Sequence, residues 1–379
     1  MVCVMCGWLV AIPLTRHPSS SWCPAPGRDG PTFAWSTRST SSSRPGRAYL
    51  WSPPIIGWRG RSRSPRRAVR PSAGDADWGM PSDAFATFEA ERPRLFGLAY
   101  RLLGSAHEAE DVVQDAFLRW NGADHVVDRP SAWLAKVVTN LALNRLTSAR
   151  ARRERYVGPW LPEPVLTTGD ALGPVETAEQ RESVSLAFLT LLERLTPAER
   201  AVFVLREAFG HPHRDIAEIL ELSEAHCRQL HRRARQRLRA DGPRFDVDRA
   251  DATRLVERFL AAARDGDVPA LERMLAADAT SWADGGGRVG TARRPILGRE
   301  RVARYLAGAV TRFGAGIALE ITEVNGCPAA VGWAGGTVVG VLVPELAEGR
   351  VAALRIVANP EKLRFLSRQL SRSAGPSGS

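Results

Sequence analysis

Apolar residues first recur at helical spacing from about residue 82 onward, and this pattern predicts two consecutive helices. Leucine and alanine positions between residues 95 and 103 form one apolar stripe, and Gly104 suits the end of that helix. Ser105 and Glu108 have the spacing of a capping box, so a second helix is expected to begin directly after Ser105. The apolar face of this second helix comprises Ala109, Val112, Val113, Ala116, Phe117 and Trp120.

A third helix is predicted after a polar loop, because Pro130 suits a first helical turn and apolar residues recur from Trp133 to Leu146. This helix leads into four closely spaced arginines, Arg150, Arg152, Arg153 and Arg155. The three helices together predict a compact helical domain over residues 82–156.

A linker rich in Pro and Gly is expected over residues 157–178, followed by a second helical domain over residues 179–240. Residues 196–199, Thr-Pro-Ala-Glu, supply a cap, a first-turn proline and a capping-box acid, so a helix is expected to start there. Helix-turn-helix spacing is predicted from a short helix, a turn and a Ser223-capped helix at residues 214–220, 221–222 and 223–239.

Residues 250–366 combine predicted helices with predicted strands, which indicates an α+β domain. Helices are expected at 254–263, 268–276 and 299–310, and strands at 317–324, 336–343 and 351–357. Residues 367–379 are expected to form a frayed tail. The predicted fold class is therefore multidomain, with two all-α domains followed by an α+β domain.

Residues 1–79 have no helical or strand periodicity and are rich in Ser, Arg, Pro and Gly, so they are expected to be disordered. They contain eleven arginines and three acidic residues, which accounts for most of the net charge of +11. One interpretation is a basic tail that binds nucleic acid. Six tryptophans in this segment and a second start at Met80 favour the other interpretation, an upstream extension with no role.

The five cysteines are scattered and lack zinc-site spacing, so neither a metal site nor a disulfide framework is expected. The short apolar run over residues 2–14 has no basic segment before it and no clear cleavage site after it. We therefore expect neither export nor membrane insertion, a cytoplasmic location, and no cofactor.

The second helix of the helix-turn-helix carries many arginines and no acidic residue after Glu224, which suits phosphate contacts and base edges in the major groove. The simpler alternative is a solvated helix with cations near its C-terminus. Turn spacing and arginine density coincide here, which favours DNA binding. Base readers are expected at Arg228, Gln229 and Arg232, and phosphate contacts at Arg233, Arg235 and Arg237.

Residues 100–105 (YRLLGS) and 109–120 (AEDVVQDAFLRW) resemble region 2 of RNA polymerase sigma factors. This resemblance implies a helix that binds the clamp helices of the polymerase β′ subunit through Asp111, Gln114, Asp115 and Arg119. The third helix resembles the promoter-melting segment, which implies that Asn140, Asn144 and Arg145 face the −10 element. Trp133 could stack on a base, although its place in the apolar stripe favours a core role.

The second helical domain resembles sigma region 4, which implies recognition of the −35 element and contact with the polymerase β flap. No third sigma region separates the two, as is typical of extracytoplasmic-function sigma factors. The C-terminal part is similar to SnoaL-like domains, which have a cone-shaped α+β fold. Residues 160–165 (WLPEPV), 284–288 (DGGGR) and 359–363 (NPEKL) resemble segments of one sigma group that bears this domain, in which Lys and Asp usually stand where this chain has Arg288 and Glu361.

These segments imply a regulatory contact between linker and C-terminal domain, formed by Trp160, Leu161, Pro162, Asp284, Arg288, Asn359 and Lys362. SnoaL-like folds include enzymes, yet no histidine follows His231, so no catalytic residue is expected. Two roles are left for the C-terminal domain: binding of a small molecule in the cone, and a purely protein-contacting role. The alternatives to a sigma factor are a helix-turn-helix regulator with a ligand-binding domain and an enzyme with a DNA-binding appendage. A regulator has no need of a polymerase-clamp helix or a strand-melting helix, and the absence of histidine after His231 argues against the enzyme.

Overall fold

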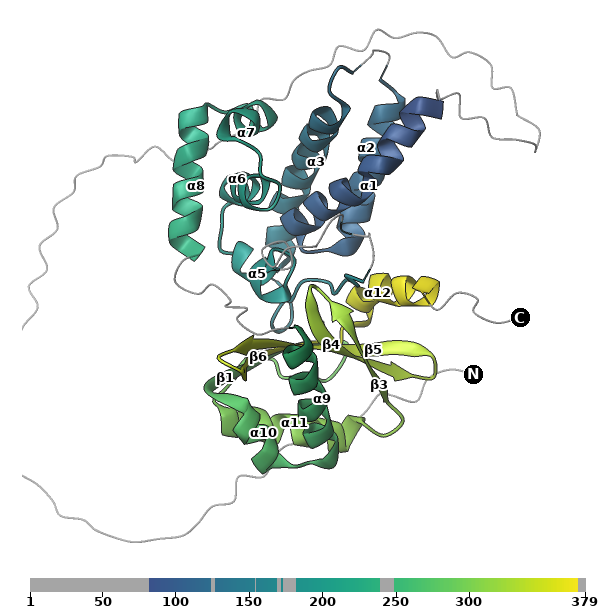
Figure 1. The fold of residues 1–379 in the computed structure, drawn as a ribbon, viewed down its shortest axis with the longest axis vertical. Coiled ribbons are helices and arrows are strands. Elements are labelled where there is room, and N and C mark those ends of the chain that lie inside the picture. Colours follow the sequence, from purple (N-terminus) through teal and green to yellow (C-terminus); the bar gives the residue numbers. More distant parts are fainter. Residues whose placement is uncertain are drawn as a thin grey trace, which may run out of the picture. The chain divides into compact units, whose positions relative to one another are not determined.

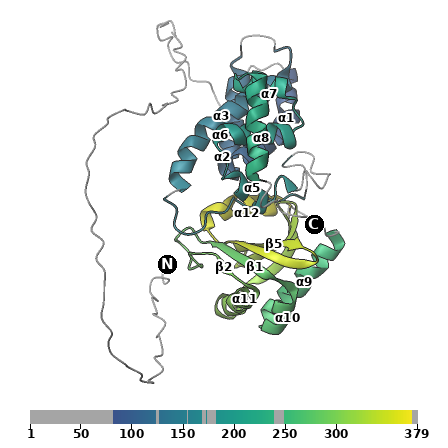
Figure 2. The same ribbon diagram turned by 90° about the vertical axis from the view of Figure 1, so that its left-hand side faces the viewer.

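The computed structural model describes residues 82–123, 127–153, 155–168, 172, 182–238 and 249–373. The prediction for residues 1–79 lies outside the described residues, as does part of the predicted linker. Within the described ranges, no helix is long and apolar enough to span a membrane. Figures 1 and 2 show the helical part of the chain and the sheet with its covering helices.

The first helical domain consists of α1 (Ser82–Leu103), α2 (Ala106–Asn121) and α3 (Pro130–Arg153). Gly104 ends α1 with a φ of 66°, a conformation that glycine adopts without strain. The Ser105 hydroxyl accepts a hydrogen bond from the Glu108 backbone N–H at 3.2 Å, which begins α2 where the capping pattern predicted. The three predicted helices are therefore confirmed.

The second helical domain consists of α5 (Leu186–Leu192), α6 (Pro197–Glu207), α7 (His213–Leu220) and α8 (Glu224–Leu238). Both hydrogen bonds of the predicted capping box at Thr196 and Glu199 are present at the start of α6. Glu221 ends α7 in the left-handed region, with a φ of 57°, and the Ser223 hydroxyl accepts from the backbone N–H of His226. The predicted helix-turn-helix is confirmed.

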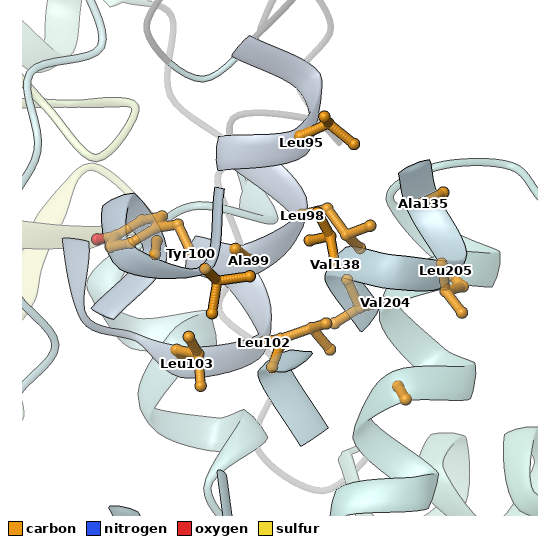
Figure 3. Close-up of a cluster of buried hydrophobic side chains, with 14 of the residues drawn as sticks. Leu95, Leu98, Ala99, Tyr100, Leu102, Leu103, Ala135, Val138, Val204 and Leu205 are labelled. Atoms are coloured by element: carbon orange, nitrogen blue, oxygen red, sulfur yellow. The ribbon is translucent and has the colours of Figure 1, made fainter. Parts of the chain in front are cut away.

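The two helical domains share one hydrophobic core. Figure 3 shows Leu98 and Leu102 of α1 in one cluster with Val138 of α3 and with Val204 and Leu205 of α6. All five side chains are buried, the most exposed of them at 2%. Separating the second helical domain from the first therefore exposes apolar surface to water.

The C-terminal domain is built on a six-stranded sheet with strand order β2-β1-β6-β5-β4-β3. The strands β1 and β6 pair in parallel, and all other neighbours are antiparallel. The strands are β1 (Leu275–Asp284), β2 (Ile296–Leu297), β3 (Ala318–Val324), β4 (Cys327–Ala334), β5 (Thr337–Ala347) and β6 (Arg350–Val357).

Helices cover both faces of this sheet (Figure 1). One face packs against α9 (Arg249–Asp265), α10 (Val268–Met274) and α11 (Arg299–Phe313), and the other carries α12 (Pro360–Ser373). This confirms the predicted α+β domain and its three predicted strands.

Several local predictions in this domain are wrong or incomplete. The helix expected to reach residue 276 ends at Met274, because Leu275 begins strand β1. Strands β1, β2 and β4 were not predicted, and the sequence of β4 is dominated by small residues. Residues 367–373 of the expected frayed tail form the second half of α12, where Leu370 is buried against the sheet. The rest of that tail lies outside the described residues. The segment 359–363, for which no helix was predicted, contains the start of this helix at Pro360.

Candidate polymerase, promoter and linker sites

Helix α2 presents the four predicted polymerase-binding side chains on its outward side, opposite its buried apolar stripe. Gln114 and Arg119 are exposed, and the side chains of Asp111 and Asp115 are 41% and 44% exposed. Leu118 lies among them and is 60% exposed, more than any other large apolar side chain in the described ranges. An apolar side chain surrounded by polar groups is typical of a protein interface. The sequence pattern did not predict Leu118 as part of this surface.

Arg145, predicted to face DNA, contacts two of the residues predicted to face polymerase. Its guanidinium donates to Asp111 at 3.0 Å and to Asp115 at 2.8 Å. Partial burial lowers the pKa of Arg145, but the hydrogen bonds to Asp111 and Asp115 outweigh it and raise the pKa overall. The chain by itself therefore holds a predicted promoter residue against its predicted polymerase surface.

The other predicted −10 residues lie on the same helix, where Asn140 is half-buried and Asn144 is exposed. Trp133 packs partly buried against the core, with its ring centroid 5.7 Å from that of Trp120. This contact supports the core role that the sequence favoured for Trp133.

Helix α8 exposes all six residues predicted to contact the −35 element, namely Arg228, Gln229, Arg232, Arg233, Arg235 and Arg237. Its opposite face, with Cys227, Leu230, Ala234 and Leu238, is buried. Two of the arginines have partners within the domain: Arg228 pairs with Glu224, and Arg237 pairs with the buried Glu199 at the start of α6. Arg237 therefore also stabilises the second helical domain, which its assignment as a phosphate contact did not include.

The linker and the C-terminal domain meet at Asp284, whose side chain is buried at the end of β1. One carboxylate oxygen accepts from the Tyr156 hydroxyl at 2.6 Å and from the backbone N–H of Gly286 in the turn that follows β1. The other accepts from the Leu161 backbone N–H at 2.9 Å and from the Lys362 ammonium at 2.6 Å. Asp284 thus binds the linker on one side and α12 on the other.

Lys362 completes this site from the first turn of α12. Its ammonium group also donates to the Leu161 carbonyl and lies 4.3 Å from the centre of the Trp160 ring. Burial lowers the pKa of Lys362 to about 8, although Asp284 opposes the shift. The Asn359 amide donates to the Tyr156 hydroxyl at 2.8 Å.

The structure brings the predicted regulatory residues together at one site. Leu161 and Pro162 are buried, and the Trp160 ring contacts two cations, Lys362 and Arg153, with the Arg153 guanidinium carbon 3.8 Å from its ring centre. Arg288 differs from the rest, because it forms an exposed ion pair with Glu361 at 2.6 Å. Its contribution to the linker contact is small for that reason.

Glu163 is a contact that the sequence did not identify. It accepts from the Ser105 hydroxyl at 2.7 Å and from the His107 backbone N–H at 3.0 Å, so it caps the N-terminus of α2. Burial raises the pKa of Glu163, and these hydrogen bonds oppose the rise. An acid between two prolines in an apolar segment was the only available signal.

Comparison with known proteins supplies the family. Residues 87–152 match the family model "Sigma-70 region 2", and residues 185–238 match "Sigma-70, region 4". The "ECF RNA polymerase sigma factor SigJ" of Mycobacterium tuberculosis H37Rv is 39% identical over 302 residues, which cover 77% of this chain and 96% of that protein. The chain belongs to the extracytoplasmic-function (ECF) RNA polymerase sigma factors.

Other similarities agree with this family. The "Probable ECF RNA polymerase sigma factor SigI" of Mycobacterium tuberculosis CDC 1551 is 31% identical over 296 residues, covering 75% of this chain and 96% of that protein. The crystal structure of Mycobacterium tuberculosis SigJ superimposes with a TM-score of 0.61 at 35% identity, covering 74% of this sigma factor and 98% of SigJ. The predicted fold class and the predicted sigma function are confirmed, and the helix-turn-helix regulator is not favoured.

Proposed function

We propose that this sigma factor docks on core polymerase through α2, using Asp111, Gln114, Asp115 and Arg119. Helix α3 would then present Asn140, Asn144 and Arg145 to the −10 element, and α8 would present its arginines to the −35 element. The observation that carries this assignment is that each set lies exposed or partly exposed on a helix whose opposite face is buried in the shared core. Action on core polymerase places the protein in the cytoplasm, and it catalyses no reaction alone.

The spacing of the promoter elements indicates that the described arrangement is a restrained state. The −35 and −10 elements are centred roughly 25 base pairs apart, which is about 85 Å along the duplex. In the chain, by contrast, α3 contacts the turn after α7 through Lys136 and Glu221, at 3.1 Å. Helix α8, with 15 residues, is itself only about 22 Å long. The two readers must separate before both elements can be bound.

We infer that the C-terminal domain regulates this separation in cis through the linker. Three observations support a protein-contacting role: the buried Asp284 site, the ion pair of Arg368 with Glu110 on α2 at 2.5 Å, and the stacking of Phe365 on Phe96. The Arg368 contact lies next to the proposed polymerase surface. Buried apolar side chains such as Phe259, Leu306 and Leu354 pack together between the sheet and its helices, which favours this role over a ligand-filled cone.

Run-off transcription tests the proposed function. The full chain is added to purified core polymerase on a genomic promoter library, and specific initiation from fragments with paired −35 and −10 elements is the expected result. Fragments lacking either element serve as controls. Absence of initiation, with a housekeeping sigma factor active in the same preparation, would contradict the assignment.

Promoter contacts on α8 are expected to separate by role. Arg228→Ala and Arg232→Ala should each weaken binding to a −35 duplex by about 1–3 kcal/mol, with a smaller effect on scrambled DNA. Arg233→Ala should weaken both duplexes alike and reduce the salt slope by about 1. Fluorescence anisotropy at several salt concentrations measures both quantities. Identical behaviour of all three variants would remove the distinction between base readers and phosphate contacts.

Graded truncation tests regulation in cis. A chain ending at Ala358 lacks α12, and with it Lys362 and the Arg368 contact to α2, so transcription is expected to rise. A chain ending at Asp246 leaves the linker without any docking partner and is expected to initiate less well. Trp160→Ala should mimic one of the two. Promoter-fusion assays at matched protein levels give the comparison, and equal activity in all three would argue against regulation by this domain.

A further inference from the structure

The hairpin between β3 and β4 turns at Asn325 and Gly326, which have φ values of 53° and 74°. Asn-Gly with positive φ at both positions is the sequence that a tight hairpin turn favours, so the backbone alone explains this dipeptide. The turn does not explain where the Asn325 side chain lies. It is 0% exposed, whereas hairpin tips ordinarily face solvent.

Asn325 forms hydrogen bonds to three separate segments of the sigma portion. Its amide nitrogen donates to the Tyr100 hydroxyl on α1 at 2.7 Å and to the Val184 carbonyl just before α5 at 2.6 Å. Its amide oxygen accepts from the Val165 backbone N–H of the linker at 3.0 Å, and its own backbone N–H donates to the Val165 carbonyl at 2.9 Å. One side chain thereby joins the first helical domain, the linker and the second helical domain.

The linker extends this contact as an added strand segment. Leu166 pairs antiparallel with Val324, and the Thr167 N–H donates to the Glu323 carbonyl at 3.2 Å. The Thr167 hydroxyl donates to the Glu323 carboxylate and accepts from the Gly326 N–H, both at 2.9 Å. This second linker contact is separate from the Asp284 site, which holds the linker at Leu161.

The hydroxyl of Tyr100 on α1 forms two hydrogen bonds at this contact. It donates to the Glu163 carbonyl at 2.6 Å while it accepts from Asn325. Burial raises the pKa of Tyr100, so the phenol stays neutral and keeps its proton for that bond. Loss of Asn325 would leave three buried partners short of a hydrogen bond, which is costly in a site closed to water.

We propose that Asn325 is a positioning residue that holds the two helical domains together through the tip of the β3–β4 hairpin. The tip must withdraw before α3 and α8 can reach the −10 and −35 elements at the same time. This inference rests on the proposed regulation in cis and adds a second contact to it. It predicts that loss of the Asn325 side chain increases transcription, whereas loss of a merely structural residue would lower it.

The test compares Asn325→Gly with Glu348→Gly in the full chain. Glycine keeps the positive φ of the turn and removes only the side chain. Glu348 is the matched control, because it occupies the equivalent position of the β5–β6 hairpin, with a φ of 51°, and is exposed. Hydrogen exchange of segments 163–168 and 184–192 reports the contact, and run-off transcription with core polymerase reports its effect.

Asn325→Gly is expected to speed amide hydrogen exchange in both segments by about tenfold or more. Each segment loses a buried hydrogen bond to Asn325 that stabilises the closed form. Transcription should rise several-fold, and Glu348→Gly should match the parent chain in both assays. Tyr100→Phe removes one atom from the opposite side and should change both readings in the same direction, so the test does not depend on a single variant folding.

Unchanged exchange in Asn325→Gly, or faster exchange with unchanged or reduced transcription, would overturn the proposal. A failure of the proposed function has a different signature. In that case no chain initiates, the parent included, although core polymerase responds to another sigma factor. The exchange measurement still decides whether Asn325 holds the segments together.

Discussion

Asp284→Ala is expected to free the linker from the C-terminal domain and to lower the free energy of unfolding by about 3–5 kcal/mol. The side chain is 1% exposed and binds Tyr156, Leu161 and Lys362. Its removal leaves the buried Lys362 ammonium without its counter-charge and the buried Leu161 N–H without its acceptor. Because the pKa of Lys362 is already lowered to about 8, Lys362 can lose its proton in this variant, which limits the loss of unfolding free energy. Urea unfolding of the full chain measures the change, and limited proteolysis near Trp160 reports release of the linker.

Arg288→Ala is the control for this prediction, because it removes the neighbouring ion pair without opening the site. Arg288 and Glu361 are 62% and 52% exposed, so their pair is expected to contribute no more than about 1 kcal/mol. If Asp284→Ala unfolded at the same urea concentration as Arg288→Ala, with the linker equally protected, the buried site would not hold the linker.

Asp111→Arg is expected to weaken binding to core polymerase by about 100-fold or more. The substitution reverses the charge at the centre of the exposed α2 surface. It also places a second guanidinium beside Arg145, which in the parent chain donates to Asp111 at 3.0 Å. Like charges at a docking interface cost several kcal/mol, and 2.7 kcal/mol corresponds to about 100-fold. Titration of labelled core polymerase with the full chain gives the affinity.

Glu300→Arg makes the same change of charge on α11, where Glu300 is exposed, and should leave polymerase binding unaltered. Binding of a −35 duplex should survive in both variants, because α8 is untouched. Retention of polymerase by Asp111→Arg would show that α2 docks through other residues, and Leu118 would then be the first to examine.

How far the sequence predicted the structure depended on whether a feature is local. The start of α6 was predicted correctly because Thr196, Pro197 and Glu199 act within one helical turn. Strand β4 was missed because its small residues acquire a strand preference only between β3 and β5. The end of α12 was misjudged for a similar reason, since Leu370 is buried by the sheet and not by its sequence neighbours.

The candidate sites show the same division. Motif resemblance grouped Trp160 with Asp284 and Lys362, and these residues lie together. The pairing of Arg145 with Asp111 and Asp115 could not be predicted, because it depends on how α3 lies against α2. Asn325 gave no signal either. A hairpin turn accounts fully for Asn-Gly, so only the tertiary structure shows that its side chain is buried against three other segments.

The shared core of the two helical domains affects how tightly the chain binds a promoter. Because Leu98 and Val204 are buried in one continuous cluster, the open form is a minor species, and only the open form can span a promoter. The apparent dissociation constant of such a protein equals the intrinsic constant divided by the open fraction. If about 1% of the chains are open, about 1.4 kcal/mol of destabilisation at this interface raises the open fraction roughly tenfold and tightens apparent binding equally. A modest signal acting on this interface can therefore set the share of target promoters that the protein occupies, with no change in its concentration.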